Sequence, residues 1–87
     1  MNRFEEARKI IERQIAGKEE MIIGCMENIE RYAKKMMCRA EDNELNNAIG
    51  YAESIGRMTK EIEELQRDIR ELRNQLSLIG YLDRKEG

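Results

Sequence analysis

Apolar residues recur along the second half of the chain with the spacing of a heptad repeat. Alternating steps of three and four residues connect ten positions without a gap: Ala48, Tyr51, Ile55, Met58, Ile62, Leu65, Ile69, Leu72, Leu76 and Ile79. This spacing puts all ten side chains on one stripe of an amphipathic helix. The pattern predicts a helix over residues 43–79, ended by Gly80 and followed by a tail over residues 80–87.

The first half of the chain has a different apolar period. Its apolar residues recur every 11 positions, in rows such as Phe4, Ile15, Met26 and Met37, and a parallel row contains one polar member, Lys18. An 11-residue repeat favours a straight or slightly right-handed path, whereas a heptad favours left-handed supercoiling. We therefore expect a helix over residues 3–40 whose apolar stripe diverges from that of the second helix.

A polar segment over residues 41–43 separates the two predicted helices. Asp42 or Asn43 is suited to cap the first turn of the second helix. Proline is absent and no strand pattern occurs, so the sequence predicts an all-α antiparallel hairpin that forms one domain over residues 1–87. Two alternatives stay open: one long bent helix, and a break at Gly17 that gives three helices. Since the 11-residue rows continue in phase across Gly17, a kink is favoured there over a chain reversal.

A single hairpin leaves apolar side chains beside its main stripes: Ile10, Met21, Ile23, Met36, Ile49, Leu78 and Leu82. Soluble monomers rarely expose a contiguous apolar surface of this kind. The sequence therefore predicts a homodimer that closes a four-helix bundle, or a higher oligomer. Charges of the heptad half, Asp68 and Arg73, are expected to pair between chains. The oligomer interface is expected along the same half, through Ile55, Met58, Ile62, Leu65, Ile69, Leu72, Leu76 and Ile79.

Composition narrows the choice of partners. Charged residues make up 39% of the chain and aromatic residues 5%, which is typical of long solvated helices. A net charge of −2 does not suit a protein that covers duplex nucleic acid. The charged opening segment does not resemble a secretory signal, and no apolar run is long enough to cross a membrane. We expect a cytoplasmic protein that binds neither membranes nor duplex nucleic acid.

Residues with catalytic chemistry are scarce. Histidine is absent, which removes the usual general base and most zinc sites. No Cys-x-x-Cys motif, phosphate-binding glycine loop or nucleophile elbow occurs. Cys25 and Cys38 lie about 20 Å apart along a helix, too far for a disulfide, and are expected to be reduced and apolar in role. We expect no enzyme activity, no catalytic residue, no metal and no cofactor.

One neighbourhood near the turn departs from the mixed charge pattern. Residues 31–39 contain four basic residues and no acidic one. Folding about residue 42 places Tyr32 opposite Tyr51 and brings Asn46, Asn47, Gly50 and Ser54 to the same region. Basic side chains suit phosphate groups and a tyrosine ring suits a stacked base. The residues expected to bind such a ligand are Arg31, Tyr32, Lys35, Arg39, Asn47 and Tyr51.

Two functions fit these features. The first is a self-associating interaction protein that acts as an adaptor or inhibitor by occluding a protein partner. The second is a sponge for a nucleotide or similar phosphate-bearing anion. The predicted shape is similar to that of the helical-hairpin dimer that binds paired RNA loops in plasmid copy control. It is also similar to that of small phage hairpins that sequester nucleotide messengers, although no motif matches either family.

Overall fold

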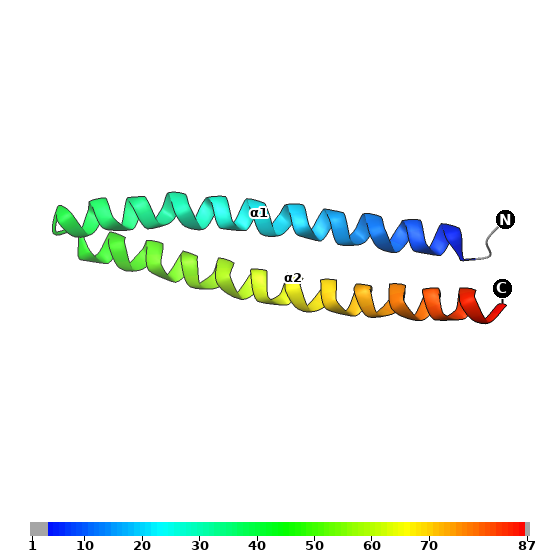
Figure 1. Cartoon of the computed structure of the whole chain (residues 1–87). Helices are drawn as coiled ribbons and strands as arrows, with labels where there is room; N and C mark the ends of the chain where they lie inside the picture. The colour runs from blue at the N-terminus through cyan, green and yellow to red at the C-terminus, as the bar shows by residue number, and fades with distance from the viewer. Residues whose placement is uncertain (1–3, 87) are drawn as a thin grey trace.

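The computed structural model describes residues 4–86 and consists of two long antiparallel helices (Figure 1). Helix α1 spans Glu5–Glu41 and helix α2 spans Leu45–Glu86, and the first turn of α1 lies at the same end of the rod as the last turn of α2. The predicted all-α hairpin is confirmed. The alternative of one bent helix is wrong because the chain reverses after Glu41, and the three-helix alternative is wrong because α1 continues through Gly17. The predicted start near residue 3 lies outside the described residues.

The turn ends α1 with a Schellman motif. Asn43 has a φ of 61°, in the left-handed region. The N–H of Glu44 donates to the carbonyl of Arg39 at 2.8 Å, and the N–H of Asn43 donates to the carbonyl of Ala40 at 3.1 Å. Asparagine tolerates this backbone conformation better than most residues other than glycine. The chain therefore reverses without glycine or proline.

Helix α2 begins later than the sequence predicts. Its first residue is Leu45, and the Glu44 carbonyl accepts the first helical hydrogen bond, from the N–H of Ala48 at 3.1 Å. The prediction that Asp42 or Asn43 caps α2 is therefore wrong. Both residues belong to the end of α1, and Glu44 occupies the N-cap position.

Helix α2 also ends later than the sequence predicts. It continues through Gly80 to Glu86, so residues 80–86 of the predicted tail are helical, while Gly87 lies outside the described residues. Gly80 is half-buried, and Asp83 accepts a 2.6 Å hydrogen bond from Arg8 of α1. Contacts with α1 thus outweigh the preference of glycine for a helix end.

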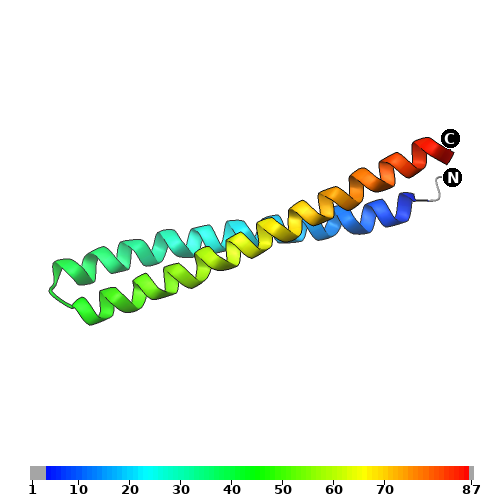
Figure 2. The ribbon, with the colours of Figure 1, turned by 90° about the horizontal axis from the view of Figure 1, so that it is seen from below.

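The contact between the helices follows a heptad on both of them. All ten predicted positions of α2 are buried or half-buried. On α1 the corresponding series has alternating steps of four and three residues: Phe4, Arg8, Ile11, Ile15, Lys18, Ile22, Cys25, Ile29, Tyr32 and Met36. We call these two series the seam. The helices cross at a small angle, as supercoiled partners do (Figure 2).

The 11-residue period does not describe how α1 packs. Met26 and Met37, two members of its clearest row, are 58% and 61% exposed. A helix that stays in contact along its length with a left-handed heptad partner has to present residues at the same 3.5-residue period. The row Phe4, Ile15, Met26 and Met37 therefore leaves the seam and runs onto the flank of α1.

The eight residues predicted at an oligomer interface belong to the seam and pack against α1. Leu65, Ile69 and Leu72 are buried within a single chain. Contact of this stripe with a second copy stays a prediction. Members of the predicted interface are Ile55, Met58, Ile62, Leu65, Ile69, Leu72, Leu76 and Ile79.

Charged residues beside the seam pair within the chain. Lys18 occupies a seam position, and its Nζ donates to Asp68 at 3.3 Å. Arg73 lies 3.8 Å from Glu19. Asp68 and Arg73, which were expected to pair between chains, therefore both have partners on α1.

The hydrophobic core is thin and lies towards the open end of the hairpin. Ile11, Ile15, Ile69 and Leu72 form its buried cluster, and no described side chain is fully buried. The radius of gyration is 19.6 Å, against about 12 Å for a globular domain of this length. The accessible surface is 6805 Å², whereas a folded monomer of 10.3 kDa exposes about 5,400 Å². One hairpin thus leaves an unusually large surface in water.

Candidate functional site

A groove of about 450 Å³ lies beside the turn, and we call it the tyrosine groove. It brings together four of the six predicted ligand residues: Tyr32, Arg39, Asn47 and Tyr51. The same groove is lined by the three small or polar residues that the hairpin was expected to place there: Asn46, Gly50 and Ser54. The predicted ligand neighbourhood is therefore a concave surface of the hairpin.

The two tyrosines pack against each other at the base of this neighbourhood. Their ring centroids are 5.6 Å apart at an interplanar angle of 61°, which is an edge-to-face arrangement. The predicted pairing of Tyr32 with Tyr51 is confirmed. Lys35 places its Nζ 5.9 Å from the Tyr32 ring centroid in a cation–π contact, and it does not line the groove. Arg31 is exposed and also lies outside the groove lining.

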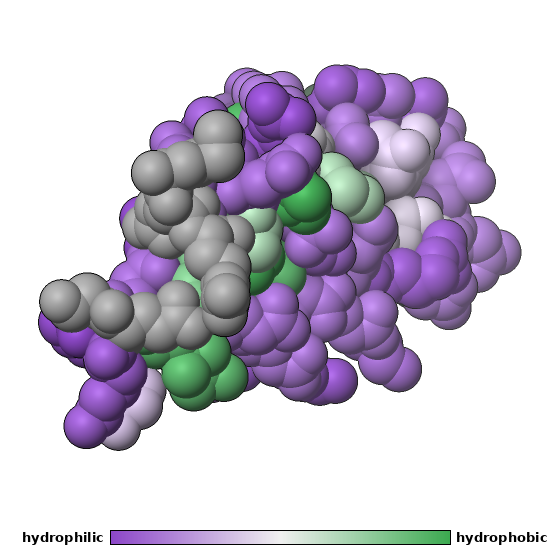
Figure 3. Space-filling view, turned by 90° about the vertical axis from the view of Figure 1, so that its right-hand side faces the viewer, coloured by the Kyte–Doolittle hydropathy of each residue, from purple (hydrophilic) through white to green (hydrophobic). Residues whose placement is uncertain are grey.

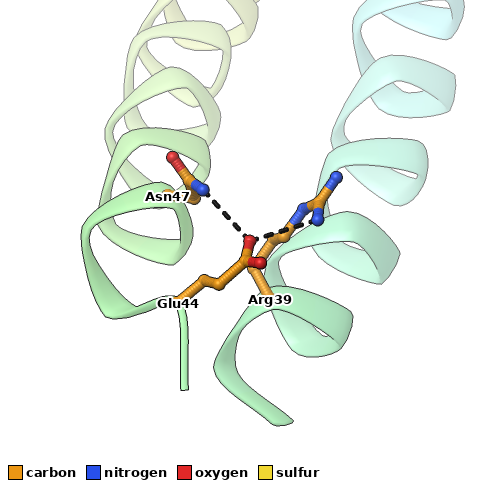
Figure 4. Close-up of polar contacts among 3 residues, drawn as sticks. All are labelled: Arg39, Glu44 and Asn47. Carbon is orange, nitrogen blue, oxygen red and sulfur yellow. Dashed lines mark hydrogen bonds and ion pairs between the residues drawn. The ribbon is translucent and has the colours of Figure 1, made fainter. Parts of the chain in front are cut away.

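The cation of the tyrosine groove is already paired. The Glu44 carboxylate accepts hydrogen bonds from Arg39 Nη1 and from Asn47 Nδ2, each at 3.1 Å (Figure 4). Arg39 and Glu44 are the two residues of the Schellman motif that usually make an apolar contact, and here an ion pair replaces it. An anion in the groove would have to compete with Glu44 for Arg39.

Glu44 was not among the residues predicted at the ligand site. Its role follows from the turn, which brings a residue just after α1 back beside the last helical turn. The available signal was an acidic residue five positions after Arg39, at the end of a polar segment.

A second concave surface lies on the other side of the hairpin and has only apolar lining. This apolar groove of about 370 Å³ is formed by Met36, Met37, Ala40, Leu45, Ala48, Ile49 and Ala52. On α2, Ala52 and Ser54 are separated by about 200° of helix rotation, which places the two grooves on opposite sides. The sequence identified Met36 and Ile49 as surplus apolar residues but did not show that they share a groove.

Many large apolar side chains are exposed at both ends of the rod. Ten such residues among those described have between 38% and 61% of their surface in water. Six of the seven predicted surplus residues are among them, while Met36 is half-buried in the seam. Five lie in the half near the turn: Ile23, Met26, Met37, Leu45 and Ile49. The other five lie in the half near the open end: Ile10, Met21, Leu78, Tyr81 and Leu82. Seen from the open end, hydrophobic residues reach the surface between hydrophilic ones (Figure 3).

The two cysteines have different surroundings. Both are free thiols, with Cys25 half-buried in the seam and Cys38 exposed. Burial, and secondly the neighbouring Glu61 carboxylate, raise the pKa of the Cys25 thiol. A raised pKa lowers the thiolate fraction and therefore the nucleophilicity of Cys25. Over residues 4–86 no group of three or more cysteine, aspartate or glutamate residues is placed to hold a metal ion, and neither helix has an apolar stretch long enough to cross a membrane.

Comparison with known proteins adds no relative to this picture. The chain matches no protein-family model, no curated protein and no solved structure. Function is therefore inferred from the surfaces of the hairpin itself.

Proposed function

We propose that the hairpin is a self-associating interaction protein that acts by covering a surface of a protein partner, as an adaptor or inhibitor, and not by chemistry. The observation that carries this proposal is the distribution of apolar side chains. Ten large ones are at least 38% exposed, whereas only six apolar residues are buried among those described. Apolar surface of this extent is typical of proteins that bind other proteins.

The excess surface has the size of a protein–protein contact. The chain exposes about 1,400 Å² more than a compact monomer of its mass. A standard interface buries about 800 Å² on each partner. The surplus is therefore larger than one contact between copies requires.

The expected affinity of such a contact is moderate. Full burial of an isoleucine, leucine or methionine contributes about 1.5–3 kcal/mol, so covering a half-exposed one contributes about 1 kcal/mol. Five such residues on each of two copies contribute about 10 kcal/mol before the cost of association, which is about 4–15 kcal/mol. At the lower end of that cost the net free energy of association is about −6 kcal/mol, which corresponds to a dissociation constant on the order of tens of micromolar.

Sedimentation equilibrium tests the proposal directly. We expect the average mass to rise above the 10.3 kDa of one chain as the concentration increases, with no change in helical circular dichroism. A fully helical protein that keeps the mass of one chain up to about 200 µM would contradict self-association.

Binding of a protein partner, the second half of the proposal, is tested with a purified complex. Immobilised wild-type hairpin and a Leu78→Lys variant, altered at a 58% exposed open-end residue, are exposed to the same cell extract. Each protein retained only by the wild type is then purified and titrated against both forms. We expect at least about tenfold weaker binding to the variant, since a lysine in an apolar contact loses burial and adds desolvation. Equal binding of every purified candidate would contradict occlusion through this surface.

A second candidate function, binding of a nucleotide or another phosphate-bearing ligand, is supported by the tyrosine groove. Its volume of about 450 Å³ falls within the usual range of small-molecule sites, and its lining combines two tyrosines with Arg39 and side-chain amides. The Arg39–Glu44 ion pair weakens its attraction for anions. Because Glu44 competes for Arg39, substitutions of the two residues are expected to change ligand binding in opposite directions.

A panel of nucleotides is screened by thermal shift against four proteins: the wild type, two groove variants and one control variant. A ligand that stabilises the wild type is expected to lose its effect on Arg39→Ala. The same ligand is expected to bind Glu44→Gln more tightly, because the competing carboxylate is gone. Lys34→Ala, changed at an exposed residue outside the groove, serves as the control. No shift across the panel, or equal shifts in all variants, would contradict a phosphate site in this groove.

A further inference from the structure

The exposed apolar residues of the turn half share one side of the hairpin. Met37, Leu45 and Ile49 line the apolar groove. Ile23 lies two heptads before Met37, and Met26 lies two heptads before Ala40, so both belong to the same side of α1. We call this set, together with Ala40 and Ala52, the turn surface. By contrast, Leu78 and Leu82 lie four heptads after Gly50 and Ser54, on the side of the tyrosine groove.

The turn surface lacks the charge found elsewhere on the rod. Between Ile23 and Ala40 on its side of α1, the one charged residue is Glu30, whose carboxylate lies 3.5 Å from Lys34. The facing stretch of α2 contributes Leu45, Ile49 and Ala52. Interfaces between identical subunits are depleted of charge at their centre in the same way.

The turn surface also carries both projections and a hollow. Met37, Leu45 and Ile49 are 55–61% exposed and border a groove of about 370 Å³ whose lining also includes the small side chains of Ala40 and Ala52. In a two-fold contact each copy presents the same patch, so the projections of one copy enter the hollow of the other. The turn surface therefore offers both of the shapes that such a contact requires.

From these observations we infer that a second copy of this chain docks on the turn surface through a two-fold symmetric contact. The inference rests on the proposed self-association and specifies its site. The surplus of about 1,400 Å², taken over the whole chain, exceeds the 800 Å² that a standard interface takes from each partner. Such a contact joins the turn halves into four helices and leaves the tyrosine groove and the open-end residues, on the opposite side, free for a protein partner.

Matched substitutions on opposite sides of α1 test the site. Met37 is 61% exposed on the turn surface, and Met21 is 52% exposed at a position rotated by about 160° on the same helix. Met37→Lys is expected to raise the dimer dissociation constant at least about 100-fold, because the two-fold contact includes the substitution twice. Met21→Lys is expected to change it less than about threefold. Circular dichroism checks that both variants stay helical.

The possible results distinguish a failure of self-association from a failure of the docking site. A monomeric wild type contradicts self-association itself, and the docking site with it. A dimeric wild type that Met37→Lys leaves unchanged, or that Met21→Lys weakens equally, overturns the turn surface as the contact and leaves self-association standing.

Cysteine cross-linking gives a second test that does not depend on weakening the dimer. Near a two-fold axis a residue faces its own copy, and a disulfide forms when the two Cα atoms are within about 7 Å. In a background with Cys25→Ser and Cys38→Ser, oxidation is expected to link copies through Ala40→Cys or Ala52→Cys. Ser54→Cys, on the opposite side of α2, is expected to stay unlinked. Linking through Ser54→Cys alone would overturn the inference.

Discussion

Replacement of Lys18 by leucine tests the heptad seam of α1. Lys18 lies in the seam between Ile15 and Ile22, and its Nζ is 3.3 Å from Asp68. Its side chain is 31% exposed and that of Asp68 is 49% exposed. An ion pair this accessible to water contributes about 0–1 kcal/mol. The position is therefore occupied by a charge that adds little stability where an apolar side chain would be buried.

The expected gain follows from burial. A leucine that buries about two-thirds of its side chain contributes about 1–2 kcal/mol, since full burial contributes about 1.5–3 kcal/mol. Leucine and lysine have nearly equal helix propensity. After subtraction of the lost ion pair, Lys18→Leu is expected to raise the free energy of unfolding by about 1 kcal/mol.

Urea unfolding followed by circular dichroism measures this change, and the midpoint of thermal unfolding is expected to rise by about 4–8 °C. Measurements at two protein concentrations separate the effect from self-association. Lys34→Leu is the matched control, because Lys34 also pairs with a carboxylate, at 3.5 Å from Glu30, but is 76% exposed. The control is expected to stay within about 0.5 kcal/mol of the wild type. If Lys18→Leu gains no more than Lys34→Leu, Lys18 does not lie in the seam.

Three further changes probe the turn, the helix interior and the thiols. Asn43→Ala is expected to lower the free energy of unfolding in urea by about 1 kcal/mol, because alanine tolerates the φ of 61° less well than asparagine does. Asn43→Gly is expected to raise it slightly, since glycine lacks a Cβ. Equal stabilities of the three proteins would contradict the left-handed turn. Gly17→Ala is expected to gain about 1 kcal/mol, since an added Cβ meets nothing within 4 Å, and a loss would show that another molecule contacts Gly17. At about pH 8 a thiol reagent is expected to modify Cys38 well before Cys25, because the raised pKa of Cys25 leaves less thiolate. The difference between the two modification rates should narrow as the pH rises and vanish in urea. Equal rates in the folded protein would contradict the seam position of Cys25.

Some contacts of the tyrosine groove follow from the position of the turn alone, and others do not. Once the turn is near residue 42, antiparallel pairing brings Tyr32 to Tyr51 without further information, and the structure has their rings 5.6 Å apart. The same antiparallel pairing places Asn47 nearby. It does not bring Glu44 against both Arg39 and Asn47, because that contact depends on the geometry of the Schellman turn.

The C-terminal end of α2 shows that packing against another helix can override a helix-end signal in the sequence. Gly80 is a good helix terminator in isolation, yet α2 continues for another six residues. Arg8 of α1 donates a hydrogen bond to Asp83, and this contact stabilises the added helical turns. A residue 75 positions away in the sequence therefore decides where the helix ends.

By itself the sequence determined the two helices, the seam of α2 and the fold-back near residue 42. Helix periodicity is a local property, and an uninterrupted apolar heptad shows it directly. Only the tertiary structure decided that α1 adopts the same period, with Lys18 inside the seam and Met37 outside it, because the course of one packed helix is imposed by the other. The tertiary structure also decided which apolar side chains beside the seam stay exposed, since their exposure depends on the face with which each helix contacts the other.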